Sequence, residues 1–161
     1  MTKAADLALG KIAALKTALI EFTDGDDAIA VADAGVVTLL TTAVAKSEGG
    51  AVTTNITQGL AKAWVNFEGD GTIATSDSLN VSGLTDRGTG NYTIAIGNDM
   101  ANATYSVTGS GTHDSGSYVA WCCIGHDTGL AAGSCPTDYL DNAATARDIE
   151  LACTTIHGDL A

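Results

Sequence analysis

Apolar residues recur at alternating three- and four-residue intervals through the first 22 residues of the chain. This spacing is the a/d stripe of a heptad repeat, and the segment contains helix-forming residues and no proline. It predicts an N-terminal helix over residues 1–22, either coiled-coil-like or packed on the chain's own head. A lone helix of this size is marginal in water, so we expect copies of itself to cover the stripe. The predicted interface residues of this self-association are Ala5, Ala8, Ile12, Leu15, Leu19 and Phe22.

Turn-forming residues follow the predicted helix at 23–27 and interrupt its period. Beyond them, the stretches 28–35, 36–44 and 51–56 are weakly alternating or β-prone, and a glycine-bearing linker at 46–50 separates the last from the others. We therefore assign residues 23–60 to a neck or shaft that contains short strands.

Strict alternation of apolar and polar residues begins at residue 61. This period is typical of strands that bury one face, and segments rich in Gly, Asn and Asp interrupt it about every ten to fifteen residues, as in sandwiches and barrels. The predicted fold class is mainly β, with a helical stem followed by an antiparallel β-sandwich head over residues 61–161. The clearest inward stripes are Ala61, Ala63, Val65 and Phe67, and then Tyr92, Ile94 and Ile96.

The last third of the chain gives three further expectations. The apolar run Tyr118–Ile124 predicts a central strand covered on both faces, with Trp121 in the core. Residues 109–116 and 125–144 predict loops, the second of them long and irregular. A terminal strand is expected to turn Ile149, Leu151 and Cys153 to one face and Glu150, Ala152 and Thr154 to the other.

Composition narrows the range of functions. The chain has 19 acidic and 7 basic residues and a net charge of −12 at pH 7, which would repel a phosphate backbone, so we expect no nucleic acid partner. No stretch approaches the roughly 20 apolar residues that cross a bilayer, and the N-terminus lacks the layout of a secretion signal. We therefore expect no membrane insertion.

No set of residues has the types and spacing of a catalytic or metal site, so we predict no enzyme, no cofactor and no metal. The four cysteines, all in the last 40 residues, are expected to be free thiols, with a bridge from Cys122 or Cys123 to Cys135 left open. As neighbours in a strand, Cys122 and Cys123 are expected to point to opposite faces. The carboxylates of Asp127 and Asp138 leave open a pair that hydrolyses glycans.

Receptor contact is expected from polar and aromatic residues in the predicted loops and at their edges. Tyr139 is the best placed of them, because its loop is long and polar. Trp64 lies on the polar face of its strand and is a candidate for packing against a neighbouring subunit. The predicted receptor-contact residues are His113, Tyr118, His126 and Tyr139.

Several stretches of the head resemble the fibre proteins of tailed bacteriophages, especially marine and cyanobacterial ones. The resemblance spans roughly 100 residues, although Arg87 stands where asparagine is expected and residues 109–145 match only in pattern. The matching stretches are QGLAKAWVNFEGDGTI (58–73), DSLNVSGLTD (77–86), GTGNYTI (88–94), MANATY (100–105) and CTTIHG (153–158).

In the resembling proteins the head is a β domain at the end of a trimeric fibre, and no catalytic or cofactor residue is implied. The resemblance implies a structural virion protein, a short trimeric fibre or spike subunit assembled in the host cytoplasm. Its partners would be copies of itself, other virion proteins through the N-terminal region, and a glycan or protein of the host surface. The alternatives are a capsid decoration protein that bridges shell subunits and a small glycan-degrading spike.

Overall fold

The computed structural model describes residues 20–21, 27–31, 37–39, 44–46, 53–113, 118–125 and 127–161. The chain divides into two units, Met1–Thr57 and Gln58–Ala161. In the part of the chain that is described, no helix has the length and hydropathy needed to cross a membrane.

The first unit contains short antiparallel strands, as expected for the neck. One sheet has the order β1-β2-β3, and β4 pairs with β5 in a separate hairpin. A single helical turn, α2 (Ile56–Gly59), follows β5 along the chain. The strands are β1 (Ile20–Glu21), β2 (Asp27–Val31), β3 (Val37–Leu39), β4 (Val44–Lys46) and β5 (Thr53–Asn55).

The predicted N-terminal helix is wrong at its C-terminal end. Ile20 and Glu21 form strand β1, and Ile20 lies opposite Ile29 of β2. Pairing with β2 supplies backbone hydrogen-bond partners that helix propensity does not take into account. The six predicted trimer-interface residues lie outside the described residues: Ala5, Ala8, Ile12, Leu15, Leu19 and Phe22.

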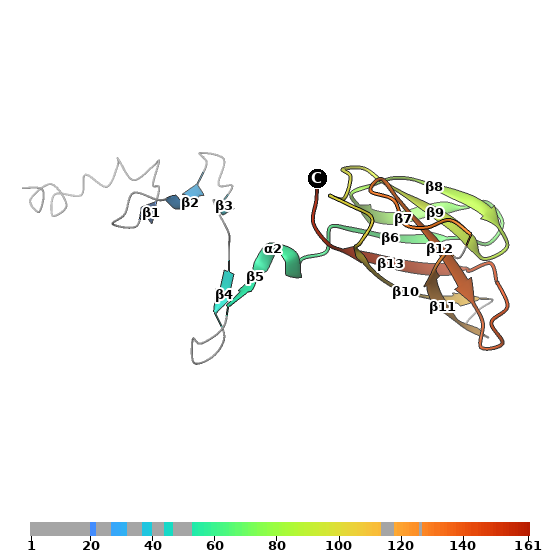
Figure 1. Cartoon of the computed structure of the whole chain (residues 1–161). Helices are drawn as coiled ribbons and strands as arrows, with labels where there is room; N and C mark the ends of the chain where they lie inside the picture. The colour runs from blue at the N-terminus through green and yellow to red at the C-terminus, as the bar shows by residue number, and fades with distance from the viewer. Residues whose placement is uncertain are drawn as a thin grey trace, which may run out of the picture. The chain divides into compact units, whose positions relative to one another are not determined.

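The second unit, which we call the head, is one antiparallel sheet of eight strands in the order β7-β6-β13-β10-β11-β12-β9-β8 (Figure 1). The mainly β, antiparallel prediction is confirmed. The predicted sandwich of two sheets differs from what is found, because one sheet curls until its end strands β7 and β8 approach each other. The strands are β6 (Ala63–Glu68), β7 (Ala74–Leu79), β8 (Val81–Gly88), β9 (Asn91–Ile96), β10 (Ser106–His113), β11 (Tyr118–Ile124), β12 (Ser134–Leu140) and β13 (Leu151–His157).

Asn80 holds the two ends of the curled sheet together. It lies in the turn between β7 and β8 with a backbone φ of 54°, a left-handed angle that asparagine tolerates better than most residues. Its Nδ2 donates to the carbonyls of Lys62 (3.0 Å) and Asn98 (3.1 Å), and its Oδ1 accepts from the Asn98 amide at 2.6 Å. One side chain therefore ties the turn to the segment before β6 and the segment after β9.

Three aromatic rings pack edge to face in the interior of the head. Phe67 lies 5.1 Å from Tyr92 and 6.1 Å from Tyr139, and the two tyrosine rings are 5.9 Å apart between centroids. Both hydroxyls are bonded: Tyr92 donates to the carbonyl of Gly69 at 2.9 Å, and Tyr139 lies 2.8 Å from Thr154 Oγ1. The inward stripes predicted on β6 and β9 are confirmed for Ala63, Val65, Phe67, Tyr92, Ile94 and Ile96, which are all buried, whereas Ala61 precedes β6 and is only partly buried.

The strands that face these rings present small residues to the interior. A Cβ added to Gly111 of β10 would lie 2.6 Å from Ile149 Cγ2 and 3.2 Å from Tyr139 Cδ1. A Cβ on Gly109 would lie 2.8 Å from the sulfur of Cys122. Because Tyr139, Ile149 and Cys122 already occupy the space beside them, Gly109 and Gly111 of β10 have no room for a side chain.

Several predictions for the last third of the chain are wrong. Residues 109–113 continue β10, and residues 134–140 form β12 inside the segment expected to be a loop. In β13 the inward residues are Ala152, Thr154 and Ile156, so Leu151 and Cys153 lie outside. Sequence alternation alone does not set the inward face of β13, because apolar residues occupy both of its faces.

We predict that Gly111→Ala destabilises the head by about 1–3 kcal/mol, because the added methyl overlaps Ile149 in a filled interior. Urea unfolding followed by circular dichroism measures the change. Gly83→Ala is the matched control, since no atom lies within 4 Å of its added Cβ. The control is expected to be neutral or stabilising by up to about 1 kcal/mol. Equal losses for both variants would contradict the crowding account.

Candidate functional site

Trp121 lies on the outer surface of the head with 67% of its side chain exposed. The prediction that it belongs to the core is therefore wrong. Ala120 and Cys122 occupy the inward positions of β11, where Tyr139 and Ile149 leave room only for small side chains. The prediction that Cys122 and Cys123 point to opposite faces is confirmed, since Cys122 lies beside Gly109 inside and Cys123 is exposed.

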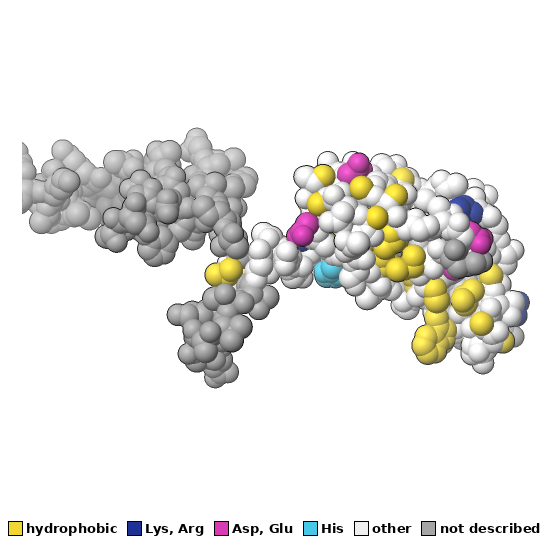
Figure 2. All heavy atoms as spheres, viewed as in Figure 1, with side chains coloured by type: hydrophobic (Ala, Val, Ile, Leu, Met, Phe, Trp, Pro, Cys, Tyr) yellow, Lys and Arg dark blue, Asp and Glu magenta, His cyan; other side chains and the backbone are white. Residues whose placement is uncertain are grey.

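Strand register places Trp121 among other outward apolar residues. Trp121 lies opposite Ser110 of β10 and Leu140 of β12. One pair further along, Thr112 lies between Val119 of β11 and Leu151 of β13. Val119 is 68% exposed and Leu151 is 46% exposed. We call the set Val119, Trp121, Cys123, Leu140 and Leu151 the Trp121 face, and Figure 2 shows hydrophobic side chains gathered where β10 and β11 lie.

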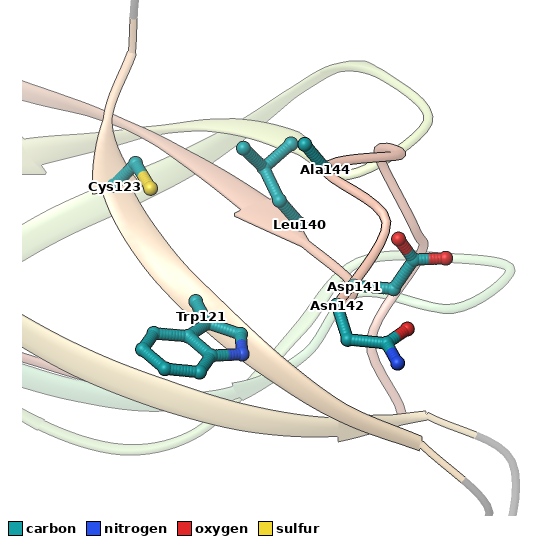
Figure 3. A pocket seen from close by; sticks show the side chains of 6 residues that line it. All are labelled: Trp121, Cys123, Leu140, Asp141, Asn142 and Ala144. Carbon is teal, nitrogen blue, oxygen red and sulfur yellow. The ribbon is translucent and has the colours of Figure 1, made fainter.

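A hollow of about 320 Å³ lies beside the Trp121 ring (Figure 3). Trp121 and Cys123 reach it from β11, Leu140 from the end of β12, and Asn142 from the loop that follows. The nitrogen-bearing edge of the indole ring faces Asn142 in this view. A second hollow, of about 290 Å³, lies on the β10 side of the ring. The indole is therefore a projecting group with space on two sides.

Asp138 and Asp141 lie beside this face and are each paired with an arginine, and the chain has only two arginines. Arg87 Nη2 lies 3.4 Å from Asp138, and Arg147 Nε lies 2.9 Å from Asp141. Asp141 also accepts the amide of Thr145 at 2.9 Å. This backbone bond first, and then the Arg147 bond, lower the pKa of the Asp141 carboxyl, so its charge is held and offset locally.

Of the four predicted receptor-contact residues, the structure describes the side chains of Tyr139 and His113. Tyr139 is fully buried in β12, so the expectation that it lies in an exposed loop is wrong. His113 is half-buried at the end of β10, opposite Tyr118. The side chain of Tyr118 and the whole of His126 lie outside the described residues.

The candidate pair of glycan-cleaving carboxylates is divided between two environments. Asp127 is exposed, whereas Asp138 is buried and paired with Arg87. Within the described ranges, no cluster of three His, Cys, Asp or Glu side chains has the arrangement of a metal site.

All four cysteines are free thiols. Cys123 and Cys153 are exposed, and burial raises the pKa of the Cys135 thiol to about 12. Burial also raises the pKa of Cys122. Among the four cysteines, only Cys123 and Cys153 are therefore exposed to a reagent in solution.

The sequence analysis did not predict that Val119, Leu140 and Leu151 lie on one exposed surface. The signal present in the sequence is an alternation of size, since small Ala120 and Cys122 interleave with large Val119 and Trp121. A hydrophobicity pattern does not register that alternation, because all of these side chains are apolar.

Comparison with protein-family models, with curated proteins and with solved structures finds no match to this chain. The structure itself defines a class: a mainly β chain whose head is a nearly closed antiparallel sheet with an exposed apolar outer face.

We predict that iodoacetamide modifies Cys123 and Cys153 in the folded protein at neutral pH, at dilutions where the chain is monomeric, and leaves Cys135 unmodified until the protein is unfolded. The exposed thiols are open to the reagent, whereas burial raises the pKa of the Cys135 thiol and keeps the reagent away from it. Mass spectrometry of peptides after timed labelling measures each rate. Labelling of Cys135 in the native protein at the rate of Cys153 would contradict the buried position.

We predict that Asp141→Asn destabilises the protein at pH 7 and that its difference from the wild type shrinks in acid. The folded-state pKa of Asp141 is lowered, so its charged form stabilises the fold above the unfolded pKa of about 3.9. That contribution is lost as pH falls through the folded pKa. Urea midpoints of both proteins from pH 7 to pH 2 measure it, and a difference that stays constant across this range would exclude a contribution from the charge.

Proposed function

We propose that this chain is a structural subunit of a bacteriophage particle, a short trimeric fibre or spike whose head makes contacts with other protein surfaces. The observation that carries this proposal is the Trp121 face, an exposed apolar patch on a strongly acidic chain. Exposed apolar patches of this kind mark sites of association, because leaving neighbouring tryptophan and valine side chains in water is unfavourable.

The resemblance of the head to phage fibre proteins supports the particle assignment. The stretches that carry it include the inward stripe of β6, the Asn80 turn and Tyr92, and each of these has a structural task in the head. The matching residues are thus those that set the shape of the sheet. The Trp121 face falls in residues 109–145 and β13, mostly where the resemblance is weakest, as expected for a surface that differs between fibres.

Light scattering coupled to size exclusion tests the assembly. We expect the full-length chain to have the molar mass of a trimer. A version lacking residues 1–22 that becomes a monomer would assign assembly to the N-terminal segment, and a version that stays a trimer would assign it to the rest of the chain. A full-length protein that is monomeric at every concentration would contradict the proposal.

Immunogold microscopy tests the location on the particle. An antibody raised against the head is expected to label purified particles of the phage that encodes the chain, at the tail or on the capsid. Label on the tail supports the fibre, and regular label over the shell indicates a decoration protein instead. Particles that carry no label would contradict a virion role.

A further inference from the structure

We propose that the Trp121 face is the contact between heads of the same assembly, with Trp121 of one copy seated in the hollow beside Trp121 of the next. This inference rests on the proposed function, because it requires the chain to associate with itself. The inference names the Trp121 face as the surface through which the heads associate.

The shape of the face supports contact with a copy of itself. A projecting indole and an open hollow of about 320 Å³ lie next to each other on one surface. In a threefold ring of copies packed head to tail, the projecting indole of each copy has the hollow of the next copy to fill. Tryptophan is also the residue most often found at the energetic centre of such contacts.

The charges on the head favour this face over the rest of the surface. Two copies of a chain with a net charge of −12 repel each other wherever their carboxylates approach. The outward residues of β10 and β11 carry no charge, and the neighbouring Asp138 and Asp141 are each paired with an arginine. These outward residues are Ser106, Thr108, Ser110, Thr112, Val119, Trp121 and Cys123. The exposed carboxylate of Glu150 lies next to Leu151, at the β13 edge of the face.

The residues that line the hollow argue against a sugar as its ligand. A sugar needs several convergent donors and acceptors around the aromatic ring. Here Asp141 accepts bonds from Ala143, Thr145 and Arg147, so both of its oxygens are already bonded. Among the residues that line the hollow, Asn142 alone adds a polar side chain, and Cys123, Leu140 and Ala144 are apolar. An apolar partner surface fits this lining better.

Fluorescence of Trp121 in the full-length chain tests the inference. The chain has two tryptophans, so Trp64→Phe leaves Trp121 as the reporter. We expect its emission to lie at shorter wavelength, with reduced quenching by acrylamide, at concentrations where the chain is associated. Dilution to the monomer is expected to restore the emission of a water-exposed indole.

Two variants made in the Trp64→Phe background give the control. Val119→Asp places like charges in the contact and is expected to raise the dissociation concentration about tenfold or more, with Trp121 emission shifted to longer wavelength. Leu79→Asp changes a 48% exposed residue on edge strand β7 and is expected to leave both readouts unchanged. Circular dichroism confirms that each variant is folded.

The outcomes separate this inference from the proposed function. An associated chain whose Trp121 stays water-exposed and quenchable would overturn the head contact and leave the trimeric subunit standing. A shift of Trp121 emission on adding mixed monosaccharides, with no change in molar mass, would overturn it in favour of a glycan site. A chain monomeric at every concentration would overturn both.

Discussion

The packing of Tyr139 against Phe67 and Tyr92 is the constraint on which the head depends. Three rings occupy the interior of a single curled sheet, and both tyrosine hydroxyls find partners on neighbouring segments. A close-packed interior has no room for further large side chains opposite them. Where β10 and β11 pass Tyr139, they therefore carry Gly109, Gly111, Ala120 and Cys122 inward.

The outer face of the head follows from that interior. With Gly111 and Ala120 inward, the large apolar residues of β11 and the start of β13 lie outside, where Trp121 and Val119 are about two-thirds exposed. Beside this face, Asp138 is paired with Arg87 and Asp141 with Arg147. The sizes of the side chains on β10, β11 and β12 thus have two consequences. The core is filled, and large apolar side chains are left on the outer surface.

Closure of the sheet depends on a different kind of interaction. Its end strands share no ladder of hydrogen bonds, and Asn80 bridges the gap with its side-chain amide. A left-handed backbone angle at this position directs the amide toward Lys62 and Asn98. The β7–β8 turn thus holds the two ends of the sheet together.

The sequence by itself determined the β class, the antiparallel strands and the inward faces of β6 and β9, because in those strands one face is apolar and the other polar. It did not determine the inward faces of β11 and β13, since both faces of those strands carry apolar residues. Only the tertiary structure decided that Tyr139 is inside and Trp121 outside. The reason is volume: the place of a side chain in a filled interior depends on the sizes of its cross-strand neighbours, which lie far apart in the chain and are brought together only by the fold.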